Sequence, residues 1–195
     1  LALFLAYKKS IKIVVHWHAD IVKQKIILKF YSILQQWMLR KADLIVTTSP
    51  KCAKESQWLQ NFQYKTISIP IGIHENTLTV NKDKLEELKK KYANKKIVFS
   101  IGRHVYYKGF EYLIKSAKYL DDEILIVIGG SGPLTDKLTK LIEDQNLNKK
   151  VELVGRIHQE DLGAYYVISK IFCLPSIARS EAFGVVQLEA MTFKK

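Results

Sequence analysis

The chain has 195 residues, 48% of them apolar and 26% charged, which fits one large or two small globular domains. Its net charge of +12 comes almost wholly from lysine, because the only arginines are Arg40, Arg103, Arg156 and Arg179. The lysines are spread along the chain and form no dense run among aromatic residues, so we expect no nucleic-acid partner. A basic face against an anionic membrane is favoured over nucleic acid, and a solvated lysine surface is the simpler alternative.

The two ends and the cysteines set further bounds. The apolar opening at 1–7 is too short to span a bilayer and lacks the layout of a signal peptide. Cys52 and Cys173 are far apart and lack metal-ligand spacing, so we expect two core residues in a reducing compartment. The chain starts in an apolar run and stops inside a helical pattern, so we expect a fragment lacking both ends.

The first part of the chain alternates strands and helices. Apolar β-branched runs predict strands at 12–17, 43–47 and 66–69, and apolar spacing with capping signals predicts helices at 21–40 and 50–59. Strands joined through helices imply parallel pairing with right-handed crossovers.

A stretch without periodicity separates this part from the next. Residues 74–80 show no apolar pattern, and we place a linker there, so that the expected domains are 1–75 and 76–195. The second domain resumes the alternation, which predicts an α/β fold with a parallel sheet. Its expected elements are helices at 82–92, 109–119, 134–146 and 159–168, strands at 96–101, 124–128, 151–154 and 171–174, and a helix that begins near Gly184.

Several polar or glycine-containing segments follow strand ends, and ligands of parallel sheets bind outside the carboxyl ends of the strands. Arg103 and Lys108 lie in a loop that opens a helix, where two cations suit a diphosphate and its departure as a leaving group. Gly129–Pro133 is either a tight turn or a ligand contact, since it lacks a complete phosphate-loop motif. The acidic turn 121–123 lies at the opposite ends of the strands, and no cluster has metal-ligand spacing, so we expect no metal.

The segment 175–191 combines a helix start with two carboxylates, Glu181 and Glu189. A helix N-terminus is an anion site, so two acids beside it suggest a ligand that needs both, such as a phosphorylated sugar. The simpler alternatives are a capping acid and a solvated helix face. His18 follows the first strand and is either structural or directed at a ligand; His104 and His158 are expected to be surface loop residues.

These residues resemble the E-x7-E motif of retaining glycosyltransferases of family 4, which have the GT-B fold. The resemblance rests on Glu181–Met191 and extends in order through Ile101-Gly102-Arg103, Tyr107–Phe110, Gly130–Pro133, Val154-Gly155-Arg156 and Pro175-Ser176. In the first part, His16–Lys25, Ala42-Asp43, Thr48–Pro50 and Ile69–Ile73 are similar to the second half of that family's acceptor domain. The sequence of residues 16–25 is most similar to that of bacterial mannosyltransferases of surface polysaccharide and lipopolysaccharide synthesis.

The resemblance implies two Rossmann-like domains with parallel sheets, both incomplete in this fragment, and a metal-independent hexosyltransferase without cofactor. The donor would be GDP-mannose or a UDP-hexose, and the acceptor a glycan or a lipid-linked sugar. Among catalytic residues, Arg103 and Lys108 would bind the donor diphosphate, Glu181 the donor sugar, and His18 would reach that sugar from the first domain. The implied donor-binding residues are Arg156 and Ile157 for the base, Phe183, Gly184, Val185 and Val186 for the distal phosphate, and Glu189 for the ribose.

The resemblance also places the protein in the cytoplasm, at the inner face of the membrane, through its lysines and lipid-linked acceptors. The family's first strand with its glycine-rich loop and its last βα units are absent, so we expect this polypeptide alone to be inactive. The alternatives are a nucleotide-sugar epimerase or hydrolase of the same fold and, from another class, a basic nucleic-acid-binding or scaffold domain.

Overall fold

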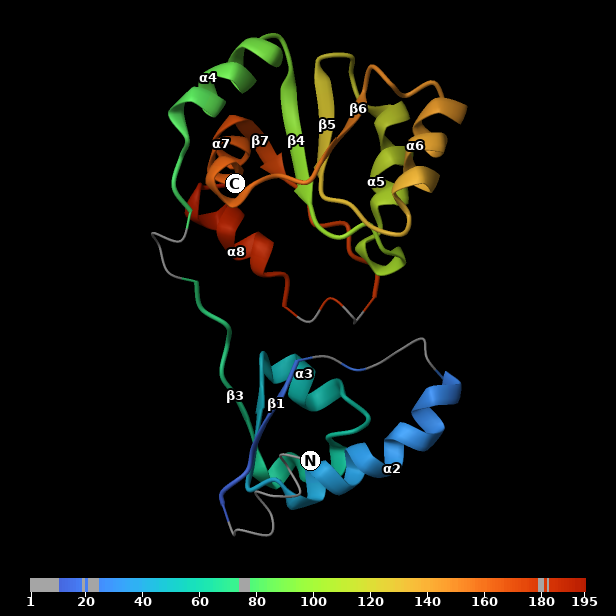
Figure 1. The fold of residues 1–195 in the computed structure, drawn as a ribbon, viewed down its shortest axis with the longest axis vertical. Helices are drawn as coiled ribbons and strands as arrows, with labels where there is room; N and C mark the ends of the chain where they lie inside the picture. The colour runs from blue at the N-terminus through green and yellow to red at the C-terminus, as the bar shows by residue number, and fades with distance from the viewer. Residues whose placement is uncertain (1–10, 19, 21–24, 74–77, 179–180, 182) are drawn as a thin grey trace. The chain divides into compact units, whose positions relative to one another are not determined.

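The computed structural model describes residues 11–18, 20, 25–73, 78–178, 181 and 183–195, which are coloured in Figure 1. They group into two compact units, one comprising 1–72 with 179–183 and the other 73–178 with 184–195. Each unit has its own sheet, and every strand pairing in both sheets is parallel. The predicted α/β class with parallel sheets is therefore confirmed.

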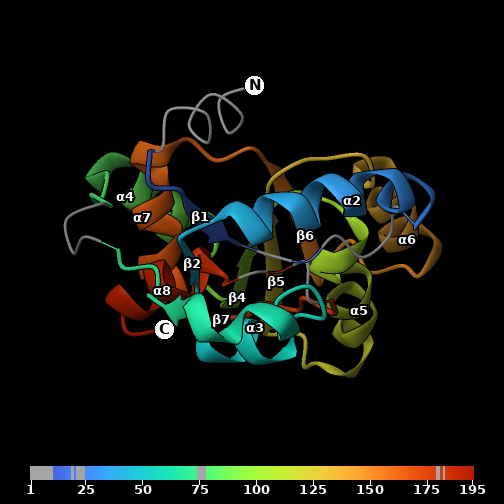
Figure 2. The same cartoon turned by 90° about the horizontal axis from the view of Figure 1, so that it is seen from below.

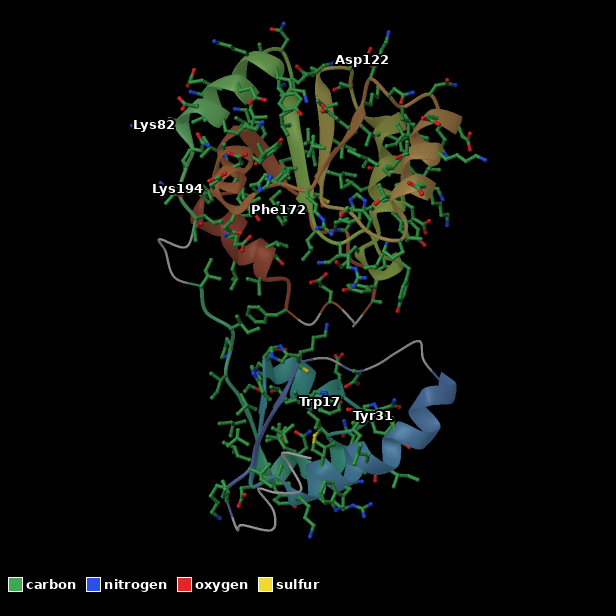
Figure 3. All side chains as sticks on the ribbon, viewed as in Figure 1. Trp17, Tyr31, Lys82, Asp122, Phe172 and Lys194 are labelled. Atoms are coloured by element: carbon green, nitrogen blue, oxygen red, sulfur yellow. The ribbon has the colours of Figure 1, made fainter. Side chains whose placement is uncertain are left out.

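The first unit is built on a three-stranded sheet in the order β1-β2-β3. Its described elements are β1 (Val14–Trp17), α2 (Lys25–Lys41), β2 (Leu44–Thr47), α3 (Pro50–Glu55), the 3-10 helix η1 (Gln60–Lys65) and β3 (Thr66–Ser68). Alternate residues of β1 point inward, so that Val15 and Trp17 pack on Leu39 and Leu59 in one apolar cluster. Figure 3 labels Trp17 among the side chains of this unit.

The helix predicted at 50–59 is shorter than its sequence pattern suggested. Ser49 caps it, because its side chain accepts a hydrogen bond from the backbone N–H of Cys52 at 3.1 Å. The helix ends at Glu55, and the next residue, Ser56, has extended backbone and donates its hydroxyl to Asp20 Oδ1 at 2.7 Å. This long-range contact ends the helix, and the chain continues into η1.

The second unit is built on a four-stranded sheet in the order β6-β5-β4-β7. Its strands are β4 (Lys96–Ile101), β5 (Ile124–Gly129), β6 (Val151–Gly155) and β7 (Ser169–Phe172). Its helices are α4 (Lys82–Lys91), α5 (Phe110–Ser116), α6 (Thr135–Asp144), α7 (Gln159–Ile168) and α8 (Val185–Thr192), with 3-10 turns η2 (Tyr106–Lys108) and η3 (Ala117–Tyr119).

Helices cover both faces of this sheet, with α4, α7 and α8 on one side and α5 and α6 on the other (Figures 1 and 2). The two apolar clusters follow from the alternation of side chains along each strand. Phe99 and Val127 belong to the cluster that includes α4, α7 and α8, whereas Ile126 and Ile128 belong to the cluster with α5 and α6. Burial on both faces explains why β5 is an almost unbroken apolar run.

Some predicted boundaries were wrong. The strand expected at 171–174 is β7 at Ser169–Phe172, because it begins directly after α7 with no connecting turn. The helix expected at 109–119 divides into α5 and η3, and the helix expected to run to 146 ends at Asp144, ahead of Asn146 with φ 54°. Residues 21–24 and 74–77, which were part of a predicted helix and linker, lie outside the described residues. None of the helices within the described ranges is long and apolar enough to cross a membrane.

Candidate functional site

Four loops of the second unit meet at one edge of its sheet. They are 102–109, 130–134, 156–158 and 173–178, and each follows the carboxyl end of a strand in a sheet that is parallel throughout. The loops after β4, β5 and β7 run together at the same end of the strands in Figure 1. In parallel α/β sheets this edge is where ligands bind. We call these four loops the rim.

The two predicted diphosphate-binding cations, Arg103 and Lys108, lie in the first rim loop. Lys108 ends η2, and its side chain folds back over Gly102: a Cβ placed on Gly102 would lie 3.2 Å from Lys108 Cε and 3.4 Å from Nζ. The ammonium group is therefore beside the residue that directly precedes Arg103. Lys108 is half-buried and Arg103 is exposed. The fold thus brings two positive charges to the same end of β4.

The glycine loop after β5 packs directly against the first rim loop. A Cβ on Gly130 would overlap the carbonyl oxygen of Gly102, and one on Gly132 would lie 2.8 Å from the backbone nitrogen of His104. Backbone hydrogen bonds join the same segments, from Gly102 N to Gly129 O at 3.1 Å and from His104 N to Ser131 O at 3.1 Å. The glycines are therefore needed for close packing of two loops, whether or not a ligand also contacts them.

His104 was predicted to be a surface residue, and this was wrong, because its side chain is 1% exposed. Its Nδ1 lies 2.9 Å from Thr135 Oγ1, and its ring packs edge-on against Phe110 with centroids 5.3 Å apart. Burial lowers the pKa of His104, and the nearby Gly129 carbonyl offsets part of that decrease. Thr135 and Phe110 therefore hold a buried histidine side chain at the base of the rim.

Arg156 and Ile157, the predicted base-binding residues, form the loop after β6. Arg156 is exposed, and its Nε donates to Ser131 Oγ at 3.0 Å. The side chain of Ile157 lies directly over Gly129, where a Cβ would come 2.5 Å from Ile157 Cδ1. The end of β6 is also bonded to the glycine loop, since Gly130 N donates to Gly155 O at 2.6 Å. These contacts fix the orientation of the Arg156 guanidinium at the rim.

The loop after β7 lies against the loop after β4, because these two strands are neighbours. Ile177 N donates to Tyr107 O at 2.8 Å. Gly109 has φ 67°, and a Cβ there would overlap the carbonyl oxygen of Pro175. Only glycine fits this position without displacing the loop. Residues about seventy positions apart in the sequence are thus held side by side.

The helix α8 begins at this edge, directly after Gly184. Gly184 is buried against Leu174, and no side chain caps the helix among the described residues. The predicted phosphate-binding residues Gly184, Val185 and Val186 are therefore the Ncap and the first turn of α8, where backbone N–H groups point out of the helix. The positive end of the helix dipole favours an anion at this point.

Glu189 lies one turn further along α8 and is half-buried. Its Oε2 accepts a hydrogen bond from the hydroxyl of Tyr166 at 2.9 Å. Tyr166 is fully buried on α7 and was not singled out from the sequence. The sequence did contain an indication of this role, because a tyrosine on the core face of a helix needs a hydrogen-bond partner for its hydroxyl.

Three of the predicted residues belong to the first unit. Glu181 and Phe183 are half-buried and belong to the segment 179–183, which groups with the first unit. His18 is exposed at the end of β1 in the first unit, with its ring 4.0 Å from that of His16. Asp20 accepts a hydrogen bond from Trp17 Nε1 at 2.9 Å.

Within the described ranges, no group of three or more His, Cys, Asp or Glu side chains is arranged to hold a metal ion. Cys52 and Cys173 are half-buried free thiols, and burial raises the pKa of both. The arrangement that remains is a cationic loop, a helix N-terminus and a carboxylate at one sheet edge, which can bind a phosphorylated ligand with hydroxyl groups.

Comparison with known proteins identifies the family of this chain. Residues 81–195 match the family described as glycosyl transferases group 1. The chain is 31% identical over 193 residues to O-antigen chain mannosyltransferase C of Escherichia coli, covering 99% of this chain and 51% of that protein. It is 32% identical over 183 residues to D-rhamnosyltransferase WbpZ of Pseudomonas aeruginosa, covering 93% of this chain and 47% of that protein. The chain therefore spans about half the length of these curated relatives.

Solved structures agree in fold. Anabaena HepE in complex with UDP and glucose superposes with a TM-score of 0.85 at 18% identity, covering 100% of this chain and 54% of that one. Sucrose-phosphate synthase from Thermosynechococcus elongatus superposes with a TM-score of 0.79 at 22% identity, covering 98% of this chain and 52% of that one. Since the family match spans 81–195 and includes the whole rim, this chain belongs to the glycosyl transferases group 1 family and has the α/β architecture of GT-B glycosyltransferases.

Proposed function

We propose that the whole protein is a retaining hexosyltransferase of family 4. It transfers a sugar, with mannose the favoured candidate, from GDP-mannose or a UDP-hexose to a glycan or lipid-linked acceptor in surface polysaccharide synthesis. The proposal includes no metal and no cofactor, and it places the enzyme in the cytoplasm at the inner face of the membrane. Similarity to a mannosyltransferase and a rhamnosyltransferase of bacteria supports transfer of a hexose or deoxyhexose.

The observation that carries the proposal is the fold of Lys108 over Gly102, beside Arg103. Two cations at one strand end can neutralise the charge that develops on a diphosphate as it leaves the sugar. The N-terminus of α8, at Gly184, Val185 and Val186, supplies backbone donors for the distal phosphate. No side chain in this scheme needs to act as a nucleophile, because a leaving phosphate oxygen takes the proton of the acceptor hydroxyl.

The remaining predicted residues have roles in the same scheme. Glu181 contacts hydroxyls of the donor sugar, Phe183 lies near the distal phosphate, and Glu189 accepts hydrogen bonds from the ribose. Arg156 and Ile157 lie against the base, and His18 reaches the donor sugar from the first unit. In this assignment the acidic residues accept hydrogen bonds from sugar hydroxyls, while the cations and the helix dipole bind phosphate. Charges of both signs are therefore required at the rim.

The test is a transfer assay on the whole protein with GDP-mannose, UDP-glucose and a lipid-linked acceptor. Released nucleoside diphosphate and glycosylated product are quantified together, and the anomeric configuration of the product is read by NMR. Equal amounts of both, with retention, support the proposal. Free nucleotide without glycosylated product would instead indicate a hydrolase or an epimerase.

The substitution Lys108→Ala tests the leaving-group role. We expect kcat to fall about 10²- to 10³-fold, as for loss of one preorganised charge-stabilising group. The matched control is Lys118→Ala, because Lys118 lies in η3 over the ring of Tyr119 at 4.6 Å, away from the rim. Unchanged turnover by Lys108→Ala would remove this residue from the mechanism.

A further inference from the structure

Glu189 does not stand alone on α8, because its carboxylate is held from a neighbouring helix. The hydroxyl of Tyr166 lies 2.9 Å from Glu189 Oε2 and 3.2 Å from the carbonyl oxygen of Val186. A hydroxyl has one proton to donate, and the charged and closer carboxylate oxygen is the stronger acceptor. The second carboxylate oxygen, Oε1, is left to accept from another group.

Tyr166 is itself immobilised. It is fully buried, with its ring edge-on to Phe99 at 5.4 Å, tilted to Phe172 at 5.6 Å and stacked on Phe193 at 5.4 Å. Its backbone carbonyl accepts from Ser169 Oγ at 2.8 Å. Figure 3 labels Phe172, next to α7 and α8 in this unit. An aromatic ring fixed on several sides holds its hydroxyl at one point in space, as a positioning group requires.

The hydroxyl also keeps its proton. Burial, followed by the Glu189 carboxylate, raises the pKa of Tyr166 above its ordinary value. Tyr166 therefore remains a hydrogen-bond donor throughout the physiological range. The same hydroxyl is close to Val186 in the first turn of α8, so one group from α7 orients both the carboxylate and the helix that carries it.

We infer that Tyr166 is the positioning residue of the ribose site: it fixes the rotamer of Glu189 so that Oε1 points at the vicinal hydroxyls of the nucleotide ribose. The inference rests on the proposed function, which assigns the ribose to Glu189. It adds that recognition of these hydroxyls depends on a residue that never touches the ligand. The preference for ribose over its deoxy forms is then a property of the Tyr166–Glu189 pair.

The experiment measures a ratio rather than an affinity. Dissociation constants of GDP and UDP, and of their 2′,3′-dideoxy counterparts, are determined for the whole protein by calorimetry. The ribose preference is the dissociation constant of the dideoxy nucleotide divided by that of the parent. We expect Tyr166→Phe to lower this preference about threefold to tenfold, the effect of losing one ordinary intramolecular hydrogen bond. We expect Glu189→Ala to bring it close to one.

A matched control exists in the same unit. Tyr92 is buried and donates its hydroxyl to Glu152 Oε2 at 3.0 Å, a pair of the same chemistry. It follows α4 and lies at the amino end of β4, opposite the rim. Tyr92→Phe should lower stability about as much as Tyr166→Phe and leave the ribose preference unchanged. In Tyr166→Phe/Glu189→Ala, the tyrosine change should add nothing to the effect of the glutamate change.

The outcomes separate the two claims. If Glu189→Ala leaves the ribose preference unchanged, the proposed ribose role of Glu189 is wrong and the inference fails with it. If Glu189→Ala abolishes the preference but Tyr166→Phe weakens both nucleotides equally, Tyr166 is only structural and the inference alone is overturned. Far-UV circular dichroism and urea midpoints confirm that each variant is folded.

Discussion

A single buried side chain, His104, links protonation to the stability of the rim. Because burial lowers its pKa, the unfolded chain binds a proton at this histidine at a higher pH than the folded chain does. The free energy of unfolding should therefore decrease as the pH is lowered through the range between these two pH values. His104→Asn retains a polar group near Thr135 but does not titrate, so we expect a shallower pH dependence between pH 7 and 5, measured by urea unfolding. The substitution should reduce the slope of the free energy of unfolding against pH by at most about 1.4 kcal/mol per pH unit.

The control for this prediction is His158→Asn, since His158 is exposed at the start of α7. It should leave the pH dependence unaltered. An identical slope in wild type and His104→Asn would mean that some other group carries the acid sensitivity.

For single residues of the rim, the sequence predicted the chemical type of the side chain better than it predicted how deeply the side chain is buried. Arg103 and Lys108 lie in the loop after β4, and Glu189 lies on α8, the helix that begins at the rim. His104 was misjudged because its side chain is buried by packing against Phe110 of α5 and Thr135 of α6, which no local pattern reveals. Tyr166 was missed because a tyrosine in an apolar helix resembles an ordinary core residue until its acceptor on α8 is seen.

At the scale of elements, the contact between the loops after β4 and β7 depends on Gly109. Alanine there would face two costs, a left-handed backbone conformation and overlap with the Pro175 carbonyl. The first costs about 1–2 kcal/mol and the crowding about 1–3 kcal/mol. We expect Gly109→Ala to lower the free energy of unfolding by roughly 2–5 kcal/mol, the sum of these two. Urea unfolding followed by circular dichroism measures it.

The control isolates the backbone cost. Gly155 has a similar φ of 71°, but nothing lies within 4 Å of a Cβ placed there. Gly155→Ala should therefore cost only the first part, about 1–2 kcal/mol. If both variants lose the same stability, the contact with Pro175 contributes nothing and the two loops are not coupled.

The order and type of the elements followed from apolar periodicity, but several ends did not. The end of α3 is set by Ser56 bonding Asp20, a contact over 36 residues that a local window cannot contain. The pairing of β7 with β4 was also invisible in the alternation of strands and helices, because the same pattern permits other strand orders. Parallel pairing could be inferred from the sequence, whereas adjacency could not.

At the scale of the whole molecule, the net charge of +12 leads to a prediction about membranes. The protein should bind vesicles that contain about 30% anionic lipid at low salt, and dissociate as ionic strength rises toward 1 M, where the screening length falls to about 3 Å. Co-sedimentation at increasing sodium chloride measures this. Vesicles of neutral phosphatidylcholine are the control, and equal binding to both would contradict an electrostatic membrane contact.

Two contacts join the loop after β4 to the loop after β7: the hydrogen bond between Ile177 and Tyr107, and the close packing of Gly109 against Pro175. These contacts affect the expected ligand affinity. We expect the loop that carries Arg103 and Lys108 to move together with residues 175–177, because neither segment can shift without displacing the other. A diphosphate that contacts both therefore immobilises one body instead of two independent loops. Less conformational entropy would then be lost on binding, which would favour affinity for the proposed nucleotide donor.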